Sequence, residues 1–434
     1  MRARGVVGVL ALLMGLVGGA AGCSEGASVE TARGGSTIEV MYAFSGSQAT
    51  GFKEAVDAWA GRHDVQVSYS GSDDLTTDLR ARIAAGNPPD LAVLPQPGLA
   101  LELARAGAVE QLDDVLPVSR VASGMVPGMV APLQTGGRTY GIPVAMNVKS
   151  LLWYDRHALH AVDIDPPQTM DDLAAAADRL RDHGSTPWCL GIEDGANSGW
   201  AGTDWIEELV LKGAGPEVYD GWVAGRVPFS DERIKQAFTT YAEVVQHDAV
   251  EGGGPAAARR DVRHAADGLF AEPQRCALLK QGSYVTQQGF LPERVRTAID
   301  QTTSVVAFPT GDNDAIEVGG DSAVLLRGHD PAARDLVRYM GSDPRFGADW
   351  AGSEDRGFIS PREDFDLERY ASTTTRKIAS AAYQAQTVRF DASDQMPPAL
   401  GSGAFARGMV GLTAGTVTVD QLVAQLDAAR AKKG

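Results

Sequence analysis

The sequence predicts an α/β protein of two domains, each a β-sheet with helices packed on its faces. Two observations lead to this fold class. From Thr37 to Leu94, apolar residues alternate between the two-residue period of strands and the spacing of amphipathic helices. About 410 of the 434 residues would remain after removal of an N-terminal leader, which is more than one ordinary hydrophobic core accommodates.

The first domain is predicted from five consecutive segments. They are a strand (Ile38, Val40, Tyr42), a helix (Phe52, Ala55, Val56, Trp59, Ala60), a strand (Val65, Val67, Tyr69), a helix (Leu75, Leu79, Ile83) and a strand (Asp90 to Leu94). The second helix is expected to end at Gly86, because Pro88 and Pro89 cannot continue it. Strands and helices that alternate in this way predict a parallel sheet covered by helices.

Polar residues follow the first and third of these strands. Phe44, Ser45 and Ser47 come after the first strand and Gln96 after the third. Ligands bind beyond the carboxyl ends of strands in such sheets, and hydroxyl and amide groups can bond a neutral polar ligand. The alternative is that each segment is only a turn or a helix cap.

Several segments together resemble one family, the extracellular solute-binding proteins of ABC importers, and within it the carbohydrate-binding type. The segments are Ala85-Gly-Asn-Pro-Pro-Asp-Leu-Ala-Val93, Tyr140-Gly-Ile-Pro143, Trp153-Tyr154, Gly199-Trp-Ala-Gly-Thr-Asp-Trp205, Gly282-Ser-Tyr284, Gly320-Asp321 and Gly357-Phe-Ile-Ser-Pro361. Their order covers nearly the whole mature chain, and the segments around Cys189 and Trp200 look most like the alpha-glucoside branch.

The resemblance implies a two-lobed periplasmic-binding-protein type II fold with discontinuous domains and a ligand cleft between the lobes. Lobe 1 would comprise residues 37–147 and 310–364, and the helix-rich lobe 2 residues 148–309 and 365–434. The sequence supports a chain that passes between the lobes. An alternating strand at 144–148 would lead out of lobe 1, the apolar segment 305–309 would lead back to it, and residues 317–326 would form a strand there. In lobe 2, Thr169 and Gly184 would bound one helix, and Ile234, Phe238, Tyr241 and Val245 would form the buried face of another.

Trp200, Asp204 and Trp205 are the main candidates for sugar contact. A flat ring packs on the C–H face of a pyranose, and a carboxylate accepts hydrogen bonds from its hydroxyls. A helix is expected to start at Thr203, with Trp200 in the preceding loop. The alternative is that both tryptophans are core residues and Asp204 complements a helix dipole; Trp205 is the better candidate for a structural role.

Further candidates lie beside other turns. Tyr284 would form a second aromatic wall, and Asn147 lies on the crossing strand. Gly320, Asp321 and Arg356 lie at glycine bends where a ligand could approach. Asp321 could instead cap a turn, and Arg356, where the family often has a smaller residue, could form a surface ion pair.

Residues 1–22 are predicted to be a lipoprotein signal peptide. Arg2 and Arg4 precede an apolar run, and the small residues before Cys23 suit cleavage there. Acylation of Cys23, for example with palmitate, would tether the protein to the extracytoplasmic face of the membrane, with residues 23–36 as a flexible linker. Ala20 stands where bacterial lipoproteins usually have Leu, and plain secretion and an uncleaved anchor are the alternatives.

Once Cys23 is acylated, Cys189 and Cys276 form an even pair in an oxidising compartment and predict a disulfide. Two buried free thiols are the alternative. Cleavage would leave 37 basic against 56 acidic residues, a net charge of about −19, which disfavours nucleic acid as a partner.

Motifs of enzymes are weak in this chain. His157 and His160 lack the pattern of a zinc hydrolase, and Gly401-Ser-Gly-Ala-Phe-Ala406 follows prolines rather than a strand. We therefore expect no catalytic activity, cofactor or metal. The predicted function is that of a monomeric, lipid-anchored receptor that delivers a mono- or oligosaccharide, such as an alpha-glucoside, to an ABC importer permease. The alternatives are an exported glycoside-hydrolase-like enzyme and a receptor for another polar solute such as glycerol phosphate.

Overall fold

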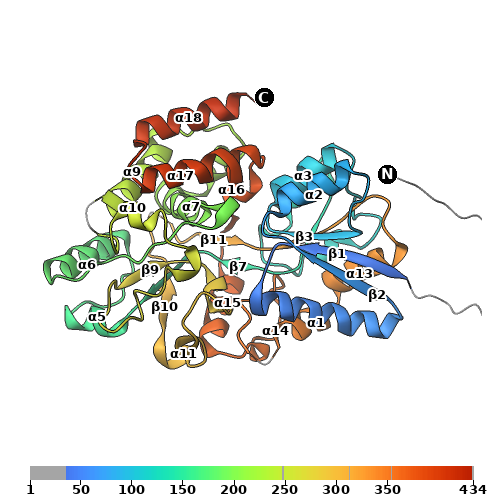
Figure 1. Ribbon diagram of the computed structural model, residues 1–434, viewed down its shortest axis with the longest axis horizontal. Helices are drawn as coiled ribbons and strands as arrows, with labels where there is room; N and C mark the ends of the chain where they lie inside the picture. The colour runs from blue at the N-terminus through green and yellow to red at the C-terminus, as the bar shows by residue number, and fades with distance from the viewer. Residues whose placement is uncertain (1–35, 247–248, 312, 353, 433–434) are drawn as a thin grey trace, which may run out of the picture. The chain divides into compact units, whose positions relative to one another are not determined.

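The computed structural model describes residues 36–246, 249–311, 313–352 and 354–432. Residues from Ser36 onward form one compact unit, shown in Figure 1. The predicted signal peptide, Cys23 and almost all of the linker lie outside the described residues. None of the described helices is long and apolar enough to cross a membrane.

The first sheet has five strands in the order β2-β1-β3-β12-β6. These strands are β1 (Thr37–Tyr42), β2 (Gln66–Gly71), β3 (Leu91–Leu94), β6 (Ile142–Pro143) and β12 (Ser322–Leu325). The first three are parallel, as predicted, whereas β12 runs antiparallel to both β3 and β6.

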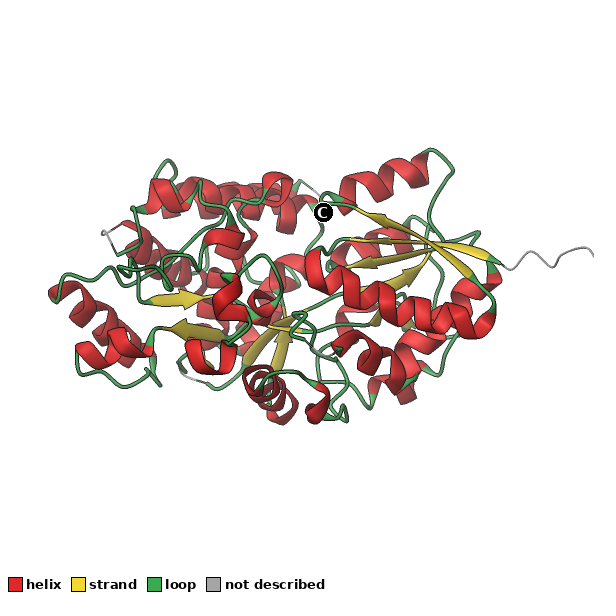
Figure 2. Cartoon of the chain, turned by 60° about the horizontal axis from the view of Figure 1, so that its bottom comes forward, coloured by secondary structure: helices red, strands yellow, loops and turns green. Residues whose placement is uncertain are grey.

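Helices cover both faces of this sheet (Figures 1 and 2). One face carries α2 (Leu75–Ala84) and α3 (Pro97–Arg105), and the other carries α1 (Gly46–His63), α13 (Pro331–Ser342) and α14 (Pro344–Ala351). The strand period explains the two layers, because Ile38 and Val40 belong to one apolar cluster and Met41 to the other. The helix predicted to end at Gly86 ends there, and Gly86 adopts a φ of 72°.

A second, antiparallel sheet has the order β10-β8-β9. Its strands are β8 (Leu151–Tyr154), β9 (Leu278–Lys280) and β10 (Ser304–Ala307). The helices around a separate apolar core are α5 (Arg156–Ala161), α6 (Met170–Asp182), α7 (Trp200–Ala214), α8 (Pro216–Val223), α9 (Glu232–Gln246), α17 (Ala406–Thr413) and α18 (Val419–Ala431). Thr169 caps α6, as predicted, and together with Asp172 it forms a capping box. The predicted disulfide between Cys189 and Cys276 is present.

A third sheet, β13-β11-β7, takes its strands from three distant parts of the chain. They are β7 (Asn147–Val148), β11 (Ile316–Gly319) and β13 (Val388–Phe390). The prediction of one strand over 317–326 is wrong, because β11 and β12 belong to different sheets. Gly320 separates them with a φ of 148°, and a Cβ there would lie 2.2 Å from the carbonyl oxygen of Ala145.

The predicted crossing strand at 144–148 is likewise divided. Its end forms β7, whereas Met146 makes an isolated bridge to Ile359. The remaining elements are α15 (Thr373–Gln384), which packs on the first apolar cluster, and shorter helices and strands. The shorter elements are α4 (Val118–Ala122), η1 (Ala131–Leu133), β4 (Gln134–Thr135), β5 (Arg138–Thr139), η2 (Gly195–Asn197), α10 (Gly254–Ala257), η3 (Val262–His264), η4 (Ser283–Thr286), α11 (Glu293–Arg296), α12 (Ile299–Thr302), η5 (Leu367–Arg369), α16 (Ala392–Gln395) and η6 (Ala399–Phe405).

Candidate ligand-binding site

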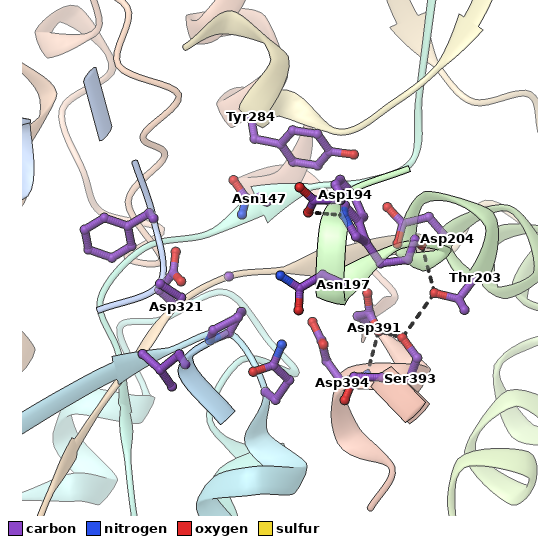
Figure 3. A pocket seen from close by; sticks show the side chains of 18 of the residues that line it. Asn147, Asp194, Asn197, Thr203, Asp204, Tyr284, Asp321, Asp391, Ser393 and Asp394 are labelled. Carbon is purple, nitrogen blue, oxygen red and sulfur yellow. Dashed lines mark hydrogen bonds between the residues drawn. The ribbon is translucent and has the colours of Figure 1, made fainter. Parts of the chain in front are cut away.

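A cavity of about 250 Å³ lies where the loops after β1 and β3 meet α7, η4, α16 and the turn between β11 and β12. Its lining combines aromatic rings with many carboxyl, amide and hydroxyl groups. In Figure 3, Asp321 lies at one side of the pocket, and Asp204, Asp391 and Asp394 lie at the other. A concave pocket with a few aromatic rings and convergent polar groups is typical of small-molecule sites.

Aromatic side chains form one wall of the cavity. The ring of Trp200 packs edge to face on Tyr284, with centroids 5.4 Å apart, and Tyr284 packs on Phe290 at 5.5 Å. The indole Nε1 of Trp200 donates a hydrogen bond of 2.9 Å to Asp194, which also pairs with Arg263 at 3.2 Å. These contacts fix the orientation of a ring that is still partly exposed to the cavity.

A buried ion-pair cluster lies beside this wall. Lys149 donates to Asp204 at 2.8 Å and also pairs with Asp391, and the three side chains are between 2% and 9% exposed. Burial alone would lower the pKa of Lys149, but the two carboxylates outweigh it and raise that pKa well above its ordinary value. Burial works to raise the pKa of Asp391, yet Lys149 and hydrogen bonds hold it below its usual value. Lys149 is therefore a permanent cation at this position.

Asp321 and Asp394 also line the cavity, and neither has an ion-pair partner among the described residues. Burial raises the pKa of Asp321 to about 7, with only the side chain of Gln48 donating to it, at 3.3 Å. Burial and the neighbouring carboxylate of Asp391 raise the pKa of Asp394 well above its usual range. Both groups can therefore exchange hydrogen bonds with a polar ligand, as donors or acceptors.

Helix α7 begins earlier than predicted. It starts at Trp200 rather than Thr203, so Trp200 lies in the first turn and Asp204 in the second. Gly199 makes this start possible, because its φ is 104° and a Cβ there would lie 1.9 Å from the carbonyl oxygen of Ala406. Gly202, which was expected before the start of the helix, lies inside it, where a Cβ would approach the side chain of Met409 to 3.0 Å.

Most of the predicted site residues line this one cavity. They are Phe44, Ser45, Gln96, Asn147, Trp200, Asp204, Tyr284, Gly320 and Asp321. They come from separate stretches of the chain, which the parallel sheet and the turn at Gly320 bring together.

Three predicted residues lie elsewhere. Trp205 is 2% exposed and packs on Trp188 in the core, which is the structural role that was its alternative. The hydroxyl of Ser47 accepts a hydrogen bond of 3.0 Å from the amide of Gln288. Arg356 is turned away and forms an ion pair of 2.7 Å with Glu54.

Several lining residues were missed from the sequence. The most prominent are Asp194, Asn197, Ser393, Asp391 and Asp394. Asp391 follows β13 and caps α16, accepting a hydrogen bond of 2.8 Å from the amide of Asp394. An Asp-x-x-Asp at the end of a short strand is a visible signal of such a cap, but its place in the cavity depends on the pairing of β13 with β11.

The sequence matches a known family over most of its length. Residues 45–344 match the family described as bacterial extracellular solute-binding protein. This match covers more than half of the chain, so the chain belongs to the bacterial extracellular solute-binding proteins, and the predicted resemblance is confirmed.

Two curated relatives align over nearly the whole chain. The osmoprotective compounds-binding protein GgtB of Synechocystis sp. is 34% identical over 86% of this chain and 87% of its own length. The alpha-glucosides-binding periplasmic protein AglE of Rhizobium meliloti is 29% identical over 89% of this chain and 85% of its own.

Solved structures with similar folds share less sequence. A chitin oligosaccharide binding protein superposes with a TM-score of 0.77 at 18% identity, covering 92% of this chain and 98% of its own. Maltose-bound MalE3 of T. maritima gives a TM-score of 0.70 at 17% identity, covering 90% and 98%. These similarities confirm the predicted fold class of two α/β lobes.

Proposed function

We propose that this protein is the receptor of an ABC sugar importer and that it binds an alpha-glucoside or a related small oligosaccharide in the cavity beside Trp200. The observation that carries the proposal is the juxtaposition of the Trp200 ring with the carboxyl groups of Asp204, Asp321 and Asp394 in one concave site. A ring can cover the C–H face of a pyranose, and carboxyl groups can exchange hydrogen bonds with its hydroxyls, as acceptors when ionised and as donors when protonated.

The size of the cavity favours a short sugar. Its volume of about 250 Å³ lies just below the range of roughly 300–1,000 Å³ found for ligand pockets. A monosaccharide or disaccharide fits this volume better than a long chain does. The name of the relative AglE supports an alpha-glucoside, and that of the relative GgtB supports a small osmoprotective solute.

The charges of the site argue against the alternative of an anionic solute such as glycerol phosphate. The cations that line the cavity in the described part of the chain are Lys149 and Arg263, and both already pair with carboxylates. Arg356, the other candidate cation, does not reach the cavity. An enzyme is also disfavoured, because the two relatives that align over most of the chain, GgtB and AglE, are both named as binding proteins.

The proposal includes the leader and the partners. Residues 1–22 would be removed as a signal peptide, and lipid on Cys23 would hold the mature protein beside the permease that receives the sugar. We keep the lobe boundaries given above and a monomeric state as part of this proposal. Mass spectrometry of the mature N-terminus tests the anchor: an unmodified Cys23, or a first residue other than Cys23, would contradict it.

Thermal-shift screening of a sugar panel, followed by titration calorimetry, tests the ligand class. A bound sugar raises the melting temperature by mass action, and an alpha-glucoside should bind stoichiometrically and remain intact. Trp200→Ala should weaken binding by about tenfold or more, because it removes the aromatic platform.

Arg356→Gln is the matched control for the position of the site. It changes a residue that the sequence placed in the site and the structure places outside it, so sugar affinity should not change. Strong binding by Trp200→Ala would show that the cavity is not the sugar site, and release of product sugars would favour the enzyme.

A further inference from the structure

We propose that Lys149 is a positioning residue of the sugar site, whose ammonium group holds the Trp200 platform and the carboxylates of Asp204 and Asp391 in their binding arrangement. This inference rests on the proposed function for the identity of the ligand. It assigns to a buried lysine a role in affinity that is separate from its role in stability.

The geometry places one ammonium group at the meeting point of three segments. Lys149 follows β7, and its Nζ donates to Asp204 in α7 at 2.8 Å and pairs with Asp391, the cap of α16. The same atom lies 5.8 Å from the centroid of the Trp200 ring. A cation at this distance is attracted to the face of an indole ring.

The surrounding residues are arranged for a cation at this position. One carboxyl oxygen each from Asp204, Glu317 and Asp391 lies within 4.8 Å of the others, a grouping of acids that could hold a metal ion. Lys149 is hydrogen-bonded to two of the three, so its ammonium group supplies the positive charge. Gly319 leaves room for the lysine stem, because a Cβ there would lie 2.9 Å from the Cε of Lys149.

Loss of this charge should disturb the site in two ways. Asp204 and Asp391 would be left as buried like charges, which repel one another and take up protons instead of staying ionised. Trp200 would lose the cation near its ring, and with it part of the force that keeps the ring against the cavity wall. Both changes act on groups that line the cavity.

The chain offers a matched control in Lys212. This lysine is also buried, with a side chain 3% exposed, and it donates to the carbonyl oxygen of Ala315 at 2.6 Å and lies 3.9 Å from Glu208. It lies on α7, as Trp200 and Asp204 do, but it is not among the described residues that line the cavity. Removing its charge therefore perturbs the same helix without touching the site.

The experiment compares Lys149→Gln with Lys212→Gln in the full-length chain. Both variants should unfold at lower temperature than the wild type. Well below those temperatures, Lys149→Gln should bind the sugar about tenfold or more weakly, and Lys212→Gln should bind it as the wild type does. Equal affinity in the two folded variants would overturn the inference and leave Lys149 with a structural role alone.

A second variant covers the case in which Lys149→Gln does not fold. Lys149→Ala, refolded with ethylammonium chloride, should regain sugar affinity in proportion to the amine, because the small cation replaces the missing ammonium group. An equal response to sodium chloride at the same ionic strength would contradict a specific cation site.

A failure of the proposed function is distinguishable from a failure of this inference. If the wild type binds no sugar of the panel, the ligand class is wrong, and Lys149 is judged by acrylamide quenching of Trp200. The Trp200 signal is isolated by difference from the same chain carrying Trp200→Phe. Quenching should increase in Lys149→Gln and stay unchanged in Lys212→Gln, and no difference between the two would overturn the inference.

Discussion

Asp321 is a buried acidic residue through which the stability of the protein should depend on pH. The residue is 6% exposed, and the side chain of Gln48 donates a hydrogen bond to its carboxyl group. Burial raises its pKa from 3.8 to about 7 in the folded protein. Because the folded protein holds this proton more tightly than the unfolded chain, Asp321 favours the folded state fully below pH 4, and this contribution is lost as the pH rises through about 7.

We predict that Asp321→Asn is more stable than the wild type at pH 8 and of similar stability at pH 4. The amide cannot ionise, so the variant avoids the cost of a buried carboxylate, which is up to a few kcal/mol for a shift of this size. Urea unfolding of both proteins across this pH range measures the difference.

Asp171→Asn, an exposed change on α6, controls for the loss of one negative charge in that experiment. A difference between Asp321→Asn and the wild type that stays constant from pH 4 to pH 8 would show that Asp321 titrates normally.

At the residue scale, aromatic residues beside glycines were useful signals for the lining of the cavity. Trp200 and Tyr284, which were expected from their places beside glycine-containing turns, both line the cavity, where Trp200 is partly exposed and Tyr284 is buried. Ser47 and Arg356 were expected in the site but do not line the cavity, because their partners, the amide of Gln288 and Glu54, come from elsewhere in the chain. Local sequence gives no information about such partners.

At the scale of elements, helix α7 depends on how its glycines are used. Gly199 has a φ of 104°, which places a Cβ against the backbone of Ala406, whereas Gly213 in the same helix is exposed and a Cβ there would contact nothing within 4 Å. Glycine is therefore required at position 199 and only tolerated at position 213.

We predict opposite effects for alanine at these two positions. Gly199→Ala should lower the free energy of unfolding by about 2 kcal/mol or more, through strained backbone and a steric clash. It should also weaken sugar binding, because Trp200 is the next residue. Gly213→Ala should raise the free energy of unfolding by roughly 0.5–1 kcal/mol, since alanine is the better helix former, and leave affinity unchanged.

Denaturant titration and calorimetry of the two variants measure both quantities. A stable Gly199→Ala variant that binds sugar normally would show that the helix can begin at another residue.

The elements with local signals were predicted well, and α7 shows why others were not. Prolines after Gly86 and the capping box at Thr169 act within a few residues, so the sequence alone locates those helix ends. Gly199 and Gly202 instead serve contacts with α17, which is about 200 residues away in the chain. Glycines used for close packing and glycines used for loops look the same in a sequence.

At the scale of the whole molecule, the parallel part of the first sheet followed from alternating strands and helices. The addition of β12 and β6 to that sheet did not, because their pairing joins segments far apart in the chain. The same limit applies to the cavity, where Asp391 and Asp394 arrive through the pairing of β13 with β11. A cleft was expected only from the resemblance to a two-lobed family. The residues that line the cavity are known from the structure.

The disulfide between Cys189 and Cys276 joins two distant parts of the chain and therefore belongs to the scale of the whole molecule. The cysteines are 87 residues apart and nearly fully buried, and the loop that the bond closes contains many residues of the second apolar core. In the simple chain-entropy model, closing a loop of this length lowers the entropy of the unfolded chain and so stabilises the folded state by about 4 to 5 kcal/mol.

We predict that Cys189→Ala with Cys276→Ala lowers the free energy of unfolding by about 2 to 5 kcal/mol, the range found when native disulfides are removed. The segment after Cys189 leads to Asp194 and Trp200, and the strand after Cys276 leads to Tyr284, so both parts of the aromatic wall depend on this link. Sugar affinity should therefore fall as well, although no ligand contact is removed.

Urea unfolding and calorimetry at a temperature where the variant is folded measure the two effects. The wild type treated with a reductant strong enough to open the bond should match the variant. Unchanged affinity in the folded variant would mean that packing alone holds the aromatic wall in place.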